Sequence, residues 1–261
     1  MLRTLGIRRF MFVESLLSSA SKSTMAPSLG ARSVLVERIT KETSVQVALS
    51  LDGGALDHLP EHDVFASLPK QTTAHHASQD SNSQKIWVWT GIGFLDHMIH
   101  ALAKHSGWSL RVRTLGDLAI DDHHTAEDTF LAIGEAFSKA LGDRKGIRRF
   151  GDAHAPLDEA LARAVLDISS RPYFVGSFGF KDAKIGNLTT QMIPHCLQSF
   201  SQTAGVTLHV DVLKGDNDHH RAEAAFKALA VACKTATEIV AGKEKEVVST
   251  KGVLAGYDGK K

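Results

Sequence analysis

The hexapeptide DHHTAE at residues 122–127 returns as DHHRAE at residues 218–223, 96 positions further along the chain. Other segments repeat with a nearly identical offset of 98 positions: FLDH at 94–97 with MIPH at 192–195, and SLRV at 109–112 with TLHV at 207–210. Two copies of a long unit indicate a duplicated half-domain, whereas a solenoid needs three or more. The repeat therefore predicts two halves of similar structure.

The pattern of apolar residues predicts the elements within each half, since alternation is typical of strands and helical spacing of helices. In the first half these are a hairpin of 34–39 and 45–51, strands at 86–90 and 108–115, and helices at 94–104 and 125–141. In the second half they are two strands within 155–180 around a turn at 170–172, a strand at 206–213, and helices at 188–203 and 219–240. Each half is then a small sheet with helices on one face, which defines the α+β class.

Composition excludes several classes of protein. Of the 261 residues, 43% are hydrophobic and 23% are charged, as in ordinary globular proteins, so disorder throughout is excluded. The net charge of +1 favours neither a nucleic acid nor an anionic membrane surface as a partner. Two cysteines are too few for a disulfide scaffold or a thiolate zinc site, and no apolar run reaches the roughly 20 residues of a membrane span.

One catalytic domain is expected over 31–120 and 121–254, built from two quasi-repeats of about 31–150 and 151–254, with a tail at 255–261. The segment 57–84 carries four histidines and little apolar periodicity; it is either an extra metal-binding tract or, the interpretation we favour, a solvated inserted loop. Residues 1–30 form an extension. Residues 1–24 contain four basic residues and one acid, which is typical of an organelle transit peptide, but Met25 offers an alternative start. We expect a cytoplasmic protein, or an organellar one if this extension is a targeting segment.

The fourteen histidines are not scattered evenly. Eight ligand-type residues lie at equivalent positions of the two halves: His97, His123, His124 and Glu127, then His195, His219, His220 and Glu223. Residues four apart share one helix face while neighbours point about 100° apart, so His123 and Glu127 can hold one ion and His124 must face elsewhere. The same holds in the second half. This predicts two ions, each with three imidazoles, one carboxylate and open positions, and the donors suit Mn, Fe, Co, Ni or Zn.

The remaining histidines of the regular elements have no such partners. We interpret His100, His154 and His209 as structural residues, and leave His105 open because it lies on the helix that carries His97.

Five motifs resemble imidazoleglycerol-phosphate dehydratase of histidine biosynthesis: GIGFLDHMIHAL at 91–102, DDHHTAEDTFLAIGEAF at 121–137, APLDEAL at 155–161, DNDHHRAEAAFKALA at 216–230 and STKGVL at 249–254. The likeness runs in order from about 32 to 254 and departs from the family in the first 30 residues and at 57–84. It implies duplicated βαβ-type half-domains of the ribosomal S5 domain 2-like kind, two Mn²⁺ ions per active site, and self-association into a 24-subunit cage with active sites at subunit contacts. The implied ligand sets are His97, His124, His219 and Glu223 for one ion, and His123, Glu127, His195 and His220 for the other.

The resemblance also implies the reaction, which removes water from D-erythro-imidazole-glycerol phosphate to give imidazole-acetol phosphate. The proton to be lost is not acidic, so the ions act as Lewis acids and as a template for the imidazole ring. Glu42, Glu223 and His97 are the expected catalytic residues; we favour Glu42 for substrate contact and Glu223 as the base. The expected substrate- and phosphate-binding residues are Glu42, His97, His105, Arg149, Arg171, Lys227, Ser249, Thr250 and Lys251. Ala101 stands where many members carry Gln, so a substrate contact is in question there.

Two other functions fit a pair of metal ions. A binuclear hydrolase also activates water on phosphate esters, but it favours carboxylate-rich ligands with a bridging Asp, which this set lacks. A metal-storage protein needs neither open coordination nor a cluster of phosphate-binding cations.

Overall fold

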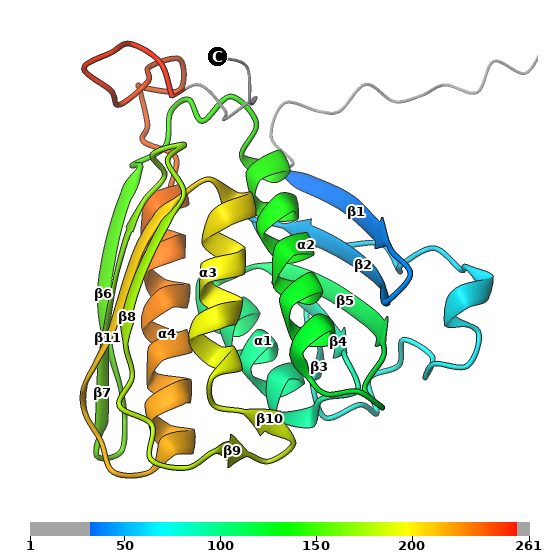
Figure 1. Ribbon diagram of the computed structural model, residues 1–261. Coiled ribbons are helices and arrows are strands. Elements are labelled where there is room, and N and C mark those ends of the chain that lie inside the picture. Colours follow the sequence, from blue (N-terminus) through cyan, green and yellow to red (C-terminus); the bar gives the residue numbers. More distant parts are fainter. Residues whose placement is uncertain (1–31, 255–261) are drawn as a thin grey trace, which may run out of the picture. The chain divides into compact units, whose positions relative to one another are not determined.

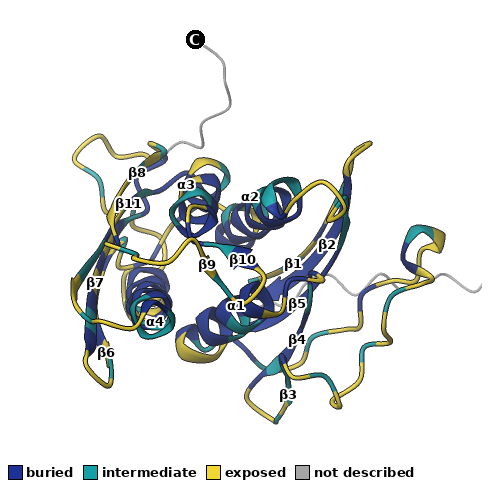
Figure 2. Cartoon of the chain, turned by 60° about the horizontal axis from the view of Figure 1, so that its bottom comes forward, coloured by how far each residue is buried: buried dark blue, intermediate teal, exposed yellow. Residues whose placement is uncertain are grey.

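A computed structural model describes residues 32–254. The extension at 1–30, with the targeting and alternative-start interpretations, and the tail at 255–261 lie outside the described residues. Two sheets enclose a layer of helices, as Figures 1 and 2 show. The four helices are α1 (Gly93–Ser106), α2 (His123–Leu141), α3 (Met192–Ala204) and α4 (Asp218–Thr237).

The two sheets share one topology. The first has the order β1 (Ser33–Ile39), β2 (Thr43–Ser50), β5 (Ser109–Gly116), β4 (Lys85–Trp89) and β3 (Ser78–Asp80). The second has the order β6 (Phe150–Leu157), β7 (Ala160–Asp167), β11 (Thr207–Lys214) and β8 (Tyr173–Ser177). In both, the first two strands form an antiparallel hairpin, and the third and fourth are parallel strands joined through a helix, α1 or α3; the first sheet adds β3 at its edge, antiparallel to β4. The predicted α+β fold with duplicated halves and helices on one face of each sheet is confirmed.

The helix layer brings the two halves together. Helix α1 packs beside α4, and α2 packs beside α3, so each pair takes one helix from each half. Close contact of α2 with α3 requires Gly134, because a Cβ at this position would lie 2.2 Å from Thr203 Oγ1 and 2.6 Å from the carbonyl oxygen of Phe200. The pairing matters for the site because histidines of both halves meet where the helices are adjacent.

Three features differ from the sequence prediction. The two strands expected around the turn at 170–172 are present as β7 and β8, but the strand β6 that precedes them was missed. The strands β6 and β7 form a hairpin whose turn residue Asp158 has φ of +47°, a conformation for which Asp is better suited than most residues. Leu188–Thr189 forms β10, paired with β9 (Lys184–Ile185), so α3 begins later than expected. Helix α4 ends at Thr237 because Glu238 is extended, with ψ of 131°.

The segment 57–84 is not simply a solvated loop. It contains a short 3-10 helix, Asp63–Phe65, and places Leu59 and Phe65 in buried positions on the outer face of the first sheet. The guanidinium of Arg113 lies 4.4 Å from the centroid of the Phe65 ring and donates to Gln46 Oε1 at 2.7 Å. Ala48 and Gln46, on the outer side of β2, are buried beneath this cover.

The outer face of the second sheet has no such cover within the described chain, and Val165, Tyr173 and Val175 are exposed on it. Among residues 32–254, no helix is long and apolar enough to cross a membrane.

Candidate metal-binding site

The first group of ligand-type side chains joins α1 and α4. Nε2 of His97 lies 3.0 Å from Glu223 Oε2, and Nε2 of His219 lies 3.3 Å from the same oxygen. All three side chains offer ligand atoms within 4.8 Å of one another. They converge because His219 and Glu223, four residues apart, share the face of α4 that packs against α1.

The second group is the internal copy of the first and joins α2 to α3. His123 and Glu127 of α2 face His195 of α3, with Glu127 carboxylate oxygens 3.6 Å from His123 Nε2 and 3.3 Å from His195 Nε2. His195 Nε2 is buried and has no hydrogen-bond partner. A buried imidazole nitrogen without a partner, next to a carboxylate and a second imidazole, suits a metal ligand.

His124 and His220 point away from these groups, as the helix geometry predicts. Each ring is nearly perpendicular to that of the preceding histidine, at 81° and 88°. Nδ1 of His124 lies 2.9 Å from Asp117 Oδ2, and Nδ1 of His220 lies 2.7 Å from Glu159 Oε2. A carboxylate on Nδ1 fixes the ring and leaves Nε2 for a metal ion. In one chain, three ligands of each set implied by the resemblance lie together. The fourth ligand of each set, His124 or His220, faces away from them.

The two carboxylate partners were missed by the sequence analysis. Glu159 lies inside the APLDEAL motif, which was the available signal, whereas Asp117 follows β5 with no motif to mark it. The hydrogen bond that His124 donates to Asp117 raises the pKa of His124, and the one that His220 donates to Glu159 raises the pKa of His220. Glu159 accepts hydrogen bonds from the backbone N–H of Asn217, which has the larger effect, and from the His220 ring. These hydrogen bonds hold the pKa of Glu159 at about 2.

Lys227 belongs to the first group, one helical turn beyond Glu223. Its Nζ lies 2.8 Å from Glu223 Oε1. Burial opposes ionisation of Glu223, but the hydrogen bond from Lys227 and the contact with His97 outweigh it and set its pKa at about 2. His105 lies two turns after His97 on α1, where burial and then nearby Lys227 lower its pKa. The buried Ala101 lies between them and offers no polar atom.

Glu42 lies in the turn between β1 and β2, beside neither group of three. Its exposed carboxylate has Oε2 4.0 Å from Nε2 of His124. Glu42 therefore faces the ring nitrogen that Asp117 leaves free.

The other predicted phosphate-binding residues gather at the opposite end of α4. The backbone N–H of Arg149 donates to the carbonyl of Ala236, and its guanidinium donates to both Asp167 oxygens, at 2.8 and 3.1 Å, and to the Val248 carbonyl at 2.6 Å. Arg171 lies 3.5 Å from Asp167. Ser249, Thr250 and Lys251 follow Val248 directly. At 1.5 Å per residue, the helix separates Ala236 from His219 by about 25 Å. Within one chain these residues do not meet the metal-binding groups.

His100, His154 and His209 belong to none of the ligand groups found among the described residues. His154 and His209 lie exposed on the outer face of the second sheet. A third group, His75, His76 and Asp96, is separate from the two described above and is treated below.

Matched imidazole and carboxylate groups on a duplicated α+β scaffold define the class as a candidate metal-binding protein. A family model described as imidazoleglycerol-phosphate dehydratase matches residues 90–233. The imidazoleglycerol-phosphate dehydratase of Neurospora crassa is 61% identical over 218 residues, which cover 84% of this chain and 93% of that protein. That of Saccharomyces cerevisiae is 57% identical over 220 residues, covering 84% of this chain and 97% of that protein.

The fold is similar to that of a solved imidazoleglycerol-phosphate dehydratase from Staphylococcus aureus, with a TM-score of 0.62 and 28% identity, covering 80% of this chain and 99% of that one. This chain belongs to the imidazoleglycerol-phosphate dehydratase family. The family assignment predicted from the sequence is thereby confirmed, and the enzyme is a dehydratase, a hydro-lyase.

Proposed function

We propose that this protein removes water from D-erythro-imidazole-glycerol phosphate to give imidazole-acetol phosphate in histidine biosynthesis, using two Mn²⁺ ions per active site. The observation that carries the proposal is the pair of matched groups, His97–His219–Glu223 and His123–Glu127–His195, each built from both halves of the chain. A duplicated site is suited to a substrate whose imidazole ring presents two nitrogens.

The residues fit a divalent ion of this kind. Each group mixes imidazole nitrogen with carboxylate oxygen and contains no thiolate, a donor set compatible with six-coordinate Mn²⁺. Three side chains in each group leave positions for a further histidine and for substrate. When bound, the ions supply Lewis acidity and hold the ring in one orientation. Nε2 of His124 and Nε2 of His220, fixed from behind by Asp117 and Glu159, are the further ligands we assign.

We assign the proton transfer to Glu42 and regard Glu223 as a ligand only. Both oxygens of Glu223 are engaged, Oε2 by two imidazoles and Oε1 by Lys227, whereas the Glu42 carboxylate is exposed and lies at the edge of the site beside His124. A general base needs a free lone pair within reach of the proton that it removes.

A second subunit would complete the phosphate-binding site. Arg149 donates to the carbonyl of Ala236, which the helix rise places about 25 Å from His219 at the metal-binding end of α4. Arg171 lies beside Asp167, which Arg149 also binds, and Lys251 is three residues beyond Val248, whose carbonyl accepts from Arg149. We therefore propose that these cations serve the metal groups of a neighbouring subunit in a closed assembly such as the 24-subunit cage. The exposed apolar side chains of the second sheet, Val165, Tyr173 and Val175, provide a surface for such contacts.

An assay of metal-free protein tests the reaction. Protein stripped with chelator and given Mn²⁺ should convert imidazole-glycerol phosphate to a ketone without releasing inorganic phosphate. Phosphate release would instead support a binuclear hydrolase, and absence of turnover with any divalent ion would contradict the proposed enzyme.

A further inference from the structure

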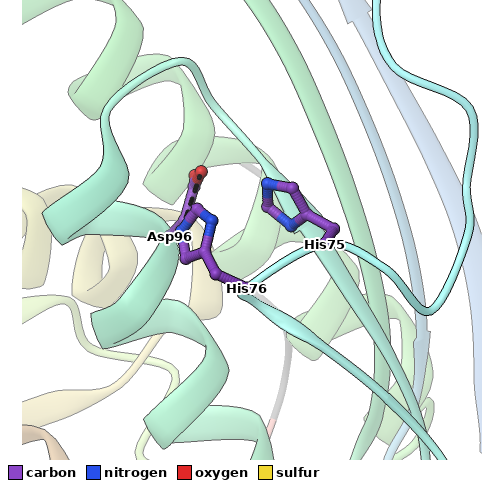
Figure 3. A group of neighbouring side chains, drawn as sticks. All are labelled: His75, His76 and Asp96. Carbon is purple, nitrogen blue, oxygen red and sulfur yellow. Dashed lines mark ion pairs between the residues drawn. The ribbon is translucent and has the colours of Figure 1, made fainter.

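A third group of ligand-type side chains lies outside the proposed active site. His75 and His76 belong to the inserted segment just before β3, and Asp96 lies in the first turn of α1. One ligand atom from each lies within 4.8 Å of those of the other two. Figure 3 shows the two imidazole rings beside the Asp96 carboxylate. No other group among the described residues joins the insertion to the helix layer in this way.

The Asp96 carboxylate is buried, and half of its hydrogen-bonding capacity is used locally. Oδ1 accepts hydrogen bonds from the backbone N–H and the hydroxyl of Thr90, both at 2.7 Å. Oδ2 faces His76 Nε2 at 3.8 Å, which is too long for a hydrogen bond. Two ligands of a tetrahedral Zn²⁺, each about 2.0–2.1 Å from the ion, stand about 3.4 Å apart, so a small movement of the exposed His76 ring brings the pair to the spacing of a shared cation.

The His75 ring is held in place with one nitrogen free. Nδ1 accepts the backbone N–H of Ala77 at 3.2 Å, and the ring centroid lies 5.2 Å from that of Trp89. Nε2 is buried and has no hydrogen-bond partner, an arrangement that a buried imidazole seldom keeps without a ligand. Coordination through Nε2 would place the ring proton on Nδ1 and replace the contact with Ala77.

We propose that His75, His76 and Asp96 form a third cation site, of a type that takes Zn²⁺, and that the ion fastens the insertion to the start of α1. Two imidazoles and one carboxylate are a typical Zn²⁺ donor set, with a fourth position open to water. The ion enters from solvent past His76, whose side chain is 54% exposed. The site goes beyond the proposed dehydratase reaction and does not depend on it.

Counting ions tests this site in the full-length, Mn²⁺-loaded protein. Protein is dialysed against increasing Zn²⁺, and total divalent ions per subunit are measured, so that exchange at the active site does not alter the sum. We expect His76→Ala to hold one ion fewer than the unchanged protein. His58→Ala removes an exposed histidine of the same insertion that belongs to no ligand group, and should match the unchanged protein. Equal ion counts in the unchanged protein and His76→Ala, or an equal loss in both variants, would overturn the site.

A second readout covers the case in which His76→Ala assembles poorly. Zn²⁺ should slow proteolytic cleavage within 57–84 in the unchanged protein and in His58→Ala, but not in the size-preserving variant His76→Gln. Dehydratase activity with Mn²⁺ alone should be the same in all three proteins. If the unchanged protein shows no dehydratase activity with Mn²⁺, the proposed function is contradicted. If Zn²⁺ protects His76→Gln from proteolysis as well as it protects the unchanged protein, the third site is contradicted.

Discussion

The two ends of helix α4 carry different chemistry. At its first turn, His219 and Glu223 meet His97 within hydrogen-bonding distance, and the donors are those of a divalent metal ion. At its last turn, the backbone N–H of Arg149 donates to the Ala236 carbonyl. The Arg149 guanidinium binds Asp167, which also lies beside Arg171, and it donates to the carbonyl of Val248. One end is suited to metal ions and the other to an anion.

This difference supports the proposal that the active site is completed by a second subunit. A substrate with an imidazole ring and a phosphate is far shorter than the roughly 25 Å that a helix of this length spans. Within one chain, the cations at the last turn of α4 therefore cannot contact a substrate that is held at its first turn. If the metal-binding end of one subunit lies against the cationic end of another, both ends can contact one substrate molecule.

The largest effect is expected from loss of a ligand at the metal-binding end. His219→Ala should lower bound Mn²⁺ per subunit and reduce activity by more than about 100-fold, since even the loss of an outer partner of a ligand costs about 10- to 100-fold. His58→Ala, which removes an exposed histidine of the insertion that belongs to no ligand group, is the control and should retain both metal and activity. Unchanged metal content in His219→Ala would refute the ligand assignment.

At the cationic end, a substitution should weaken substrate binding and spare the metal. Lys251→Ala should raise KM for the phosphate substrate by about 10- to 100-fold, the range expected for one charged hydrogen bond. Metal content, measured on the same samples, should stay at the level of the unchanged protein. A parallel loss of metal would show that the two ends are not functionally separate.

The carboxylate behind His220 should have a smaller effect, confined to metal affinity. Glu159→Gln keeps the size of the side chain but removes the charge that orients the ring, so the Kd for Mn²⁺ should rise by about tenfold. Titration of the metal-free variant with Mn²⁺ measures this. An unaltered Kd would indicate that His220 does not bind the ion through Nε2.

The smallest expected effect is on the stability of the metal-free protein in acid. The pKa of Glu159 is about 2 in the folded chain against an ordinary value of 4.5, so its contribution is complete above pH 4.5 and is lost as the pH falls from 4.5 towards 2. Thermal unfolding across this range should show a steeper acid decline in the unchanged protein than in Glu159→Gln. Identical curves would contradict the assigned interaction.

The sequence predicted the site best where the positions of the side chains follow from helix periodicity. The spacing of His123 and Glu127 predicts that they share one face, and the repeat offset predicts a second copy, because both follow from backbone geometry alone. The carboxylates of Asp117 and Glu159 come from loops, whose approach to a histidine depends on how strands and helices pack. The packing of Leu59, a residue of the insertion, against the first sheet was missed for the same reason.

The position of the cations was also beyond sequence reasoning. Arg149 and Lys227 were predicted to bind one phosphate, and nothing in their spacing shows that one lies at the far end of α4 and the other beside the metal group. Their order along the chain does not reveal which end of a helix each residue reaches.

Mixing two variants that are impaired at different ends of α4 tests the shared active site most directly. His219→Ala lacks a metal ligand but has intact cations, whereas the double variant Arg171→Ala/Lys251→Ala has the metal ligands but lacks the cations. Co-expressed in one assembly and assayed below the KM of the double variant, they should recover activity well above the sum of the two measured separately, because some sites then combine an intact metal-binding end with an intact cationic end. Activity equal to that sum, in assemblies shown to contain both chains, would contradict an active site built between subunits.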